Sequence, residues 1–151
     1  MINKVNGPGE DTFDDWKTAW TEWADKLDQL GVTIVVAGGN GGMDVATGKP
    51  RYYTDDMLPA EAVDRDSPVI AVGGVYKDGS LWEGSSPPRK DSKSELSIYA
   101  LAAEIEAYVS ADGQVKTQKN LKGTSGASAQ VVSLKSQPSC IRRLCVMSDT
   151  Y

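Results

Sequence analysis

The spacing of apolar residues near the start of the chain predicts an amphipathic helix. Apolar side chains recur three or four residues apart, as on one face of an α-helix. They are Phe13, Trp16, Trp20, Trp23, Leu27 and Leu30. Thr12 and Asp15 have the spacing of a capping box, and Gly31 is typical of the position just past a helix end. We expect the aromatic side chains of this stripe to lie in the core, against a sheet.

Runs rich in β-branched residues follow this helix. The first, Val32 to Ala37, shows no polar alternation and ends in a glycine-rich turn that contains Asn40. Such runs are typical of buried parallel strands. Val69 to Trp82 predicts a hairpin with an Asp-Gly turn, and Ile105 to Thr117 predicts a second hairpin. A helix followed by buried strands indicates an α/β fold.

Several segments are predicted to be loops or helix from their composition. Gly48 to Asp66 is expected to be a long loop, and Glu83 to Glu95 a surface insertion with solvated charges or, alternatively, a partner contact through Arg89, Lys90 and Lys93. Small and apolar residues after Ser125 indicate a buried helix. They are Ala127, Ala129, Val131, Val132 and Leu134.

Composition and charge restrict the function classes. The chain has 151 residues, 40% of them hydrophobic, and a net charge of -5, as in one soluble domain or a large piece of one. Lys and Arg total 16 against 21 acidic residues, without a basic stripe, so no nucleic-acid partner is expected. No apolar run approaches the roughly twenty residues of a membrane span, and no signal-peptide pattern is visible, so no membrane partner is expected.

The segment Gly123-Thr124-Ser125-Gly126-Ala127-Ser128 carries the first candidate chemistry. It precedes the second helical pattern and would place Ser125 at a helix N-terminus. Free backbone N–H groups and the positive end of the helix dipole favour developing negative charge there, which suits acyl transfer. The alternative is that Thr124 or Ser125 is only an N-cap.

The glycine-rich turn after the first predicted strand contains the second candidate functional residue, Asn40. Ligands collect beyond the carboxyl ends of strands in open α/β sheets, and Asn40 stands there. The alternative is a turn residue that tolerates positive φ. The glycines do not fit nucleotide-binding fingerprints, because Asp44 stands where a third glycine is needed and Pro50 follows Gly48-Lys49.

Taken together, these motifs resemble the C-terminal part of a subtilisin-like serine protease domain. The order is helix, glycine stop, buried strand, Ala-Gly-Gly-Asn-Gly turn and, later, Gly-Thr-Ser-x-Ala; Leu58-Pro59-Ala60 and Ser67 to Val75 also match. The resemblance runs from about Ile2 to Leu134. It implies a three-layer α/β domain with a mainly parallel sheet, of which residues 1–135 are the C-terminal part, followed by a divergent tail at residues 136–151.

The resemblance also implies a serine endopeptidase that cleaves a peptide or protein substrate through an acyl-enzyme. Ser125 matches the nucleophile, and Asn40 matches the asparagine that stabilises the oxyanion together with the Ser125 backbone N–H. The implied substrate-binding residues are the pocket wall, with room for a bulky group, and the end of a strand that lines the cleft. They are Ala37, Gly38 and Gly39 for the wall, and Asn6 and Gly7 for the strand end.

The chain contains no histidine. In the family, a histidine oriented by an aspartate removes the serine proton, and both precede the oxyanion asparagine, so both are expected before Met1. An exposed carboxylate is too weak a base unless its pKa is strongly raised. We therefore expect this chain alone to be inactive.

Two other classes stay open. Sedolisin-type peptidases carry a Gly-Thr-Ser motif with acidic partners, although the turn at Asn40 and the alanine at position 127 follow the subtilisin pattern better. A non-catalytic subtilase-like module that binds a protein is the second alternative. One departure from the family is Ala129, where proline is usual.

The resemblance carries further expectations. Family members are commonly secreted, so an extracellular location is expected. No cofactor is expected; calcium is common in the family, but no ligand can be assigned. Cys140 and Cys145 do not have zinc-site spacing and form either a local disulfide or two free thiols.

Overall fold

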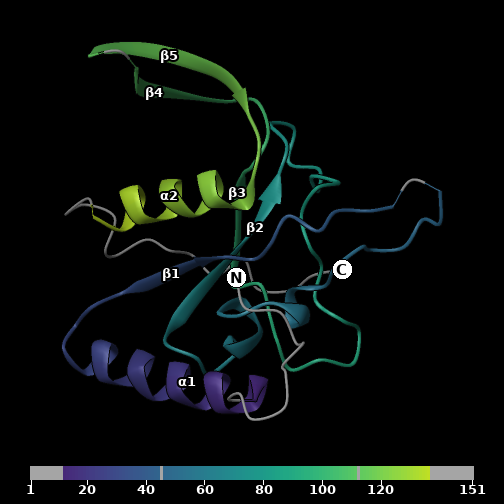
Figure 1. Cartoon of the computed structure of the whole chain (residues 1–151), viewed down its shortest axis with the longest axis vertical. Coiled ribbons are helices and arrows are strands. Elements are labelled where there is room, and N and C mark those ends of the chain that lie inside the picture. Colours follow the sequence, from purple (N-terminus) through teal and green to yellow (C-terminus); the bar gives the residue numbers. More distant parts are fainter. Residues whose placement is uncertain (1–11, 45, 112, 137–151) are drawn as a thin grey trace.

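The structure is a computed structural model that describes residues 12–44, 46–111 and 113–136. Within these residues the chain forms two α-helices, five strands and two short 3₁₀ helices (Figure 1). In chain order they are α1 (Phe13–Gln29), β1 (Ile34–Ala37), η1 (Thr54–Asp56), η2 (Ala60–Ala62), β2 (Val69–Val75), β3 (Ile98–Leu101), β4 (Ile105–Ala111), β5 (Gln114–Leu121) and α2 (Thr124–Lys135).

The central sheet is parallel, as the run at Val32 to Ala37 predicts. Its strand order is β1-β2-β3, with Ile34 opposite Val69 and Val72 opposite Ile98. β2 pairs on both sides, which explains its lack of polar residues: both of its faces are covered and both of its edges are paired.

Helices cover both faces of this sheet. One core cluster joins Ala24 of α1 to Val36, Val69 and Ala71. The other contains Ala127 and Val131 of α2, packed with side chains from the opposite faces of the same strands: Val35, Ile70, Val72, Ile98 and Ala100. Because successive strand residues point to opposite faces, α1 and α2 lie on opposite sides of the sheet (Figure 1). The predicted three-layer α/β arrangement is confirmed.

α1 begins and ends as the sequence predicts. Thr12 and Asp15 form a capping box, in which the Asp15 N–H donates to Thr12 Oγ1 at 3.1 Å and the Thr12 N–H donates to Asp15 Oδ2 at 2.8 Å. Gly31 takes a φ of 75°, and its N–H donates to the Asp28 carbonyl at 2.8 Å. These bonds between near neighbours fix both ends of the helix.

The aromatic stripe of α1 is only partly buried. Trp16 and Trp23 are 45% and 50% exposed, so the expectation that the whole stripe lies in the core is wrong for these two residues. The buried line runs through Phe13 and Ala24, with Trp20 packed against the core cluster.

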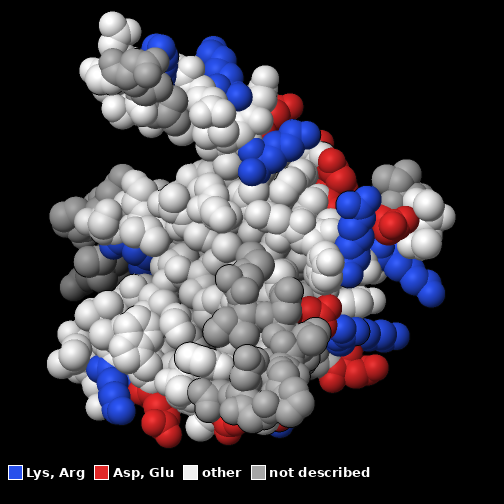
Figure 2. Space-filling view, viewed as in Figure 1, with Lys and Arg blue, Asp and Glu red and all other residues white. Residues whose placement is uncertain are grey.

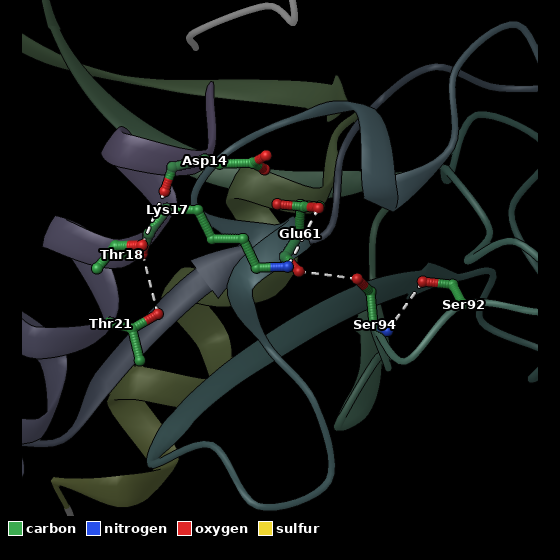
Figure 3. Close-up of polar contacts among 7 residues, drawn as sticks. All are labelled: Asp14, Lys17, Thr18, Thr21, Glu61, Ser92 and Ser94. Carbon is green, nitrogen blue, oxygen red and sulfur yellow. Dashed lines mark hydrogen bonds and ion pairs between the residues drawn. The ribbon is translucent and has the colours of Figure 1, made fainter. Parts of the chain in front are cut away.

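An ion pair accompanies this rotation of α1. The Lys17 ammonium donates to Glu61 Oε1 of η2 at 3.2 Å (Figure 3). Lys17 lies on the same side of the helix as Ala24, whose small side chain allows close approach to the sheet. With that side turned inward, Trp16 and Trp23 lie at its margin and stay half exposed.

The two predicted hairpins have different outcomes. β4 and β5 pair in antiparallel fashion, with Tyr108 opposite Thr117, and project away from the central sheet (Figure 1). The first hairpin is reduced to an isolated bridge between Val75 and Leu81 after a turn in which the Tyr76 N–H donates to the Ser80 carbonyl. β1 pairs with β2 only as far as Val72, so the end of β2 is available for this bridge and for the Trp82 N–H, which donates to the Gly74 carbonyl at 3.0 Å.

α2 is buried on one face only. Thr124, Ala127 and Val131 are buried, whereas Val132 and Leu134 are 50% and 51% exposed. The expectation of a buried helix is therefore right for the face toward the sheet and wrong for the other. No helix within the described ranges is long and apolar enough to cross a membrane. The cysteines and nearly all of the predicted tail lie outside the described residues.

Candidate active site

The Gly-Thr-Ser-Gly segment forms the first turn of α2. Gly123 precedes the helix with a φ of 142°, a conformation that favours glycine, and its N–H donates to the Ala102 carbonyl at 2.8 Å. Ser125 is the second residue of α2 and is exposed. Its backbone N–H has no acceptor within the helix, because the first turn of any α-helix lacks preceding carbonyls.

Asn40 contacts this turn, although it lies 84 residues before Thr124 in the sequence. Its Oδ1 accepts a hydrogen bond from the Thr124 N–H at 2.8 Å and another from the Thr124 hydroxyl at 2.9 Å. The amide oxygen of Asn40 thus caps α2 from outside the helix. The two motifs that were singled out separately in the sequence lie side by side.

Thr124 fixes the two segments to each other. Its side chain is fully buried, and its Oγ1 also accepts from the Gly39 N–H at 3.2 Å. The Ser128 hydroxyl donates to the Thr124 carbonyl at 2.8 Å. Thr124 is therefore bonded to the turn on one side and to its own helix on the other, and sequence reasoning had given it no such role.

Both structural alternatives for these residues are wrong. The N-cap of α2 is Gly123, so neither Thr124 nor Ser125 is the capping residue. Among the described residues, positive φ outside glycine occurs at Glu104 and Asn120, so Asn40 does not occupy a left-handed turn position. In its turn the positive φ angles belong to Gly39 and Gly42.

Two N–H donors flank one space beside Gly123. A Cβ atom placed on Gly123 would lie 3.5 Å from Asn40 Nδ2, 3.8 Å from Asn40 Oδ1 and 3.9 Å from the Ser125 backbone nitrogen. Within the described residues the hydrogen bonds of Asn40 run through Oδ1, which leaves Nδ2 to donate elsewhere. The nearest of these atoms is Nδ2, a donor nitrogen, and the space lies at the positive end of α2.

The glycines before Asn40 allow close packing by the protein itself. A Cβ on Gly38 would lie 2.4 Å from Leu96 Cδ2, and one on Gly39 would lie 2.4 Å from Met57 Cε. On these sides the space is filled by Leu96 and Met57. The wall role of Ala37, Gly38 and Gly39 stays a prediction, and Asn6 and Gly7 lie outside the described residues.

A buried serine, Ser86, forms hydrogen bonds with the backbone of the Asn40 turn. Ser86 is fully buried; its N–H donates to the Gly39 carbonyl at 3.0 Å, and its Oγ accepts from the Gly41 N–H at 2.8 Å. The Thr54 hydroxyl donates to the Ser86 carbonyl at 3.1 Å. The segment Glu83 to Glu95 is therefore not simply a surface insertion, and nothing in its local composition distinguishes Ser86 from an ordinary turn residue.

Hydrogen bonds weaken four of the described carboxylates as bases. The Tyr76 hydroxyl donates to Glu83 Oε2, which raises the pKa of Tyr76 to about 12 and lowers the pKa of Glu83. Hydrogen bonds also lower the pKa values of Asp15, Asp44 and Asp78. All four carboxylates become weaker bases, the opposite of what activation of a serine requires.

Charged side chains of both signs lie on the visible surface, and the described residues offer no grouped metal ligands. Figure 2 shows Lys and Arg side chains beside Asp and Glu side chains along the right-hand edge of the visible face. In the described part of the chain, no three Asp, Glu, Cys or His side chains are grouped so that they could hold a metal ion. The expectations on nucleic acid and calcium stay predictions.

The fold is similar to that of subtilisin-like protease domains of known structure. The maturation protease of prenylagaramide, PagA, superposes with a TM-score of 0.54 at 18% identity, over 89% of this chain and 40% of that chain. A mutant of the PatA protease domain superposes with a TM-score of 0.54 at 21% identity, over 88% of this chain and 39% of that chain. The self-cleaved PatA protease domain superposes with a TM-score of 0.53 at 24% identity, over 87% of this chain and 40% of that chain.

At these identities the likeness is one of fold. The chain spans about 40% of the length of these protease structures. The sequence matches no protein-family model and no curated protein.

Proposed function

We propose that this chain supplies the nucleophile and the oxyanion donors of a subtilisin-like serine endopeptidase, with peptides or proteins as substrates. The observation that carries the proposal is the contact between Asn40 and Thr124, which brings an amide donor and the Ser125 N–H to one space beside Gly123. The named neighbours are proteases, which agrees with a peptide substrate.

The chemistry follows from that contact. Ser125 Oγ attacks the carbonyl carbon of the scissile bond, and the carbonyl oxygen becomes an oxyanion. Asn40 Nδ2 and the Ser125 N–H donate to this oxygen, and the dipole of α2 stabilises its charge. In subtilisin, removal of one such donor lowers turnover about a hundredfold to a thousandfold, or about 3 to 4 kcal/mol. The amine is then expelled with the proton that Ser125 gave to its base, which leaves Ser125 acylated.

The proton of Ser125 needs a base that this chain does not contain. A histidine performs this step in the family, and the sequence has none. We infer that the base comes from another segment or chain, and that this chain alone does not hydrolyse peptides. A fluorophosphonate probe should therefore leave it unlabelled; strong labelling that Ser125→Ala abolishes would refute the inferred inactivity.

A separate experiment tests the oxyanion donors without the base. The protein is treated with p-nitrophenyl acetate at alkaline pH, and acetylation is followed by mass spectrometry at Ser125 and at Ser133, an exposed serine of the same helix. Donors aimed at the developing oxyanion should make Ser125 react faster, and Asn40→Asp should remove that advantage because it replaces Nδ2 by an oxygen. Equal rates at the two serines in the unaltered chain would refute the proposed function.

A further inference from the structure

A hollow of about 330 Å³ lies between the start of η1 and the segment at residues 89–92, and no residue of the Asn40 turn lines it. Its lining consists of Tyr53, Arg89, Lys90, Asp91 and Ser92. This volume is at the small end of the range of about 300 to 1,000 Å³ for ligand pockets, which suits one or two amino-acid residues.

The guanidinium of Arg89 is held in a defined position. Its plane lies over the Tyr53 ring, 4.2 Å from the ring centroid, and Nη2 donates to Asp56 Oδ1. The Arg89 backbone N–H donates to Asp55 Oδ2 at 2.7 Å, and Asp55 is only 5% exposed. The Tyr53 backbone N–H donates to Asp56 Oδ2 at 2.9 Å, so the same carboxylate binds the Tyr53 backbone and the Arg89 guanidinium.

Arg89 keeps donors for a ligand despite these contacts. Its side chain is 51% exposed, and the bond to Asp56 uses one of the five N–H donors that a guanidinium carries. Because the side chain is already oriented, little further rotamer entropy is lost when a ligand binds.

The charge of the hollow favours an anion. Arg89 and Lys90 against Asp91 give the lining a net charge of +1, on a chain whose net charge is -5. Within the described residues the ion pairs involve Lys17, Arg51, Arg89 and Lys119 and not Lys90, whose ammonium is therefore available. Asp56 beside Arg89 offsets part of the positive charge, which suits a carboxylate with one charge better than a phosphate with nearly two.

Ser92, which lines the hollow, is connected to the rest of the protein by hydrogen bonds through Ser94. The Ser94 N–H donates to Ser92 Oγ at 2.9 Å, and the Ser94 hydroxyl donates to the Glu61 carbonyl at 2.8 Å (Figure 3). Glu61 is in turn paired with Lys17 of α1. Ser92 accepts from Ser94 and keeps its own hydroxyl hydrogen for a ligand, on a wall tied to the body of the protein.

We propose that this hollow binds a carboxylate group of a peptide. The guanidinium fork of Arg89 matches the two oxygens of a carboxylate, Lys90 adds a second charge-assisted hydrogen bond, and the Ser92 hydroxyl adds a neutral one. The carboxylate comes from a Glu or Asp side chain or from a peptide C-terminus, which share this chemistry. The site does not depend on Ser125, so the proposal stands independently of the proposed protease function.

Fluorescence anisotropy at about 0.15 M salt tests the proposal with three labelled peptides. The first is blocked at both ends and carries one central Glu, the second has Gln in its place, and the third has Gln and a free C-terminal carboxylate. The Glu peptide or the free-acid peptide should bind about tenfold more tightly than the blocked Gln peptide. Whichever of the two binds more tightly identifies the source of the carboxylate.

Variants separate the hollow from general attraction to positive charge. Lys90→Gln should remove most of the preference for the carboxylate peptide and leave the melting temperature unchanged. Arg89→Lys should also remove most of this preference, because the planar guanidinium fork is lost. Lys93→Gln, a nearby cation outside the lining, should keep the preference, and so should Ser125→Ala. Equal binding of all three peptides, equal effects of Lys90→Gln and Lys93→Gln, or stronger competition by inorganic phosphate than by acetate would each overturn the proposal.

Discussion

Asn40 has two separable roles in the structure, and substitution can distinguish them. Its Oδ1 accepts hydrogen bonds from the Thr124 N–H and hydroxyl, whereas its Nδ2 faces the space beside Gly123. Asn40→Ala removes both the acceptor and the donor. Asn40→Asp keeps an acceptor of the same shape and removes only the donor.

The magnitudes follow from the burial of Thr124, which is fully buried and loses two hydrogen bonds to Oδ1 in Asn40→Ala. An unsatisfied buried donor costs about 1 to 3 kcal/mol, and loss of a helix cap costs about 0.5 to 2 kcal/mol. Because Asn40 itself is exposed, water can accept some of the hydrogen bonds that Oδ1 accepted. We therefore expect Asn40→Ala to lower the free energy of unfolding by about 2 kcal/mol. In Asn40→Asp the bonds persist, and the carboxylate at the positive end of α2 adds about 0.3 to 1 kcal/mol of stability.

Urea unfolding followed by far-UV circular dichroism measures both variants. With a slope of about 2 kcal/mol per molar urea, Asn40→Ala should unfold at about 1 M lower urea, and Asn40→Asp should unfold at the same concentration as the unaltered protein or a higher one. In the acetylation assay, Asn40→Asp should nevertheless lose the advantage of Ser125. If Asn40→Ala were as stable as the unaltered chain, or Asn40→Asp as unstable as Asn40→Ala, the capping role of Oδ1 would be refuted.

Two further predictions concern the turn and the first helix. Gly39→Ala should destabilise the protein by at least about 1 kcal/mol more than Gly48→Ala: both positions have positive φ, but only at Gly39 does the new Cβ meet a side chain, Met57 Cε at 2.4 Å. Equal midpoints in urea for the two variants would contradict this contact. Hydrogen bonds from Thr12 lower the pKa of Asp15 in the folded state, so their contribution is present above the unfolded pKa of about 3.9 and is lost as the pH falls through the folded value. The helical signal should therefore weaken below about pH 4, and Asp15→Asn should flatten this dependence; an unchanged acid transition in that variant would count against the capping box.

The sequence by itself determined the elements whose causes are local. α1 is bounded by the capping box at Thr12 and Asp15 and by the left-handed glycine at Gly31, all of which act within one helical turn. The continuous apolar run into β1 likewise predicted a buried parallel strand. These signals depend on interactions between residues close in sequence, so they can be recognised without the fold.

The family resemblance implied that Asn40 lies close to Ser125, but only the tertiary structure showed which groups of these and other distant segments bond to each other. Asn40 bonds to Thr124 across 84 residues, and Ser86 bonds to Gly39 and Gly41 from a segment predicted to lie on the surface. No local pattern carries these pairings, because packing of whole elements against the sheet determines the distance between segments remote in sequence. The same packing turned Trp23 toward solvent, because an apolar periodicity shows that a face exists but not how far the helix is rotated when it meets its partner.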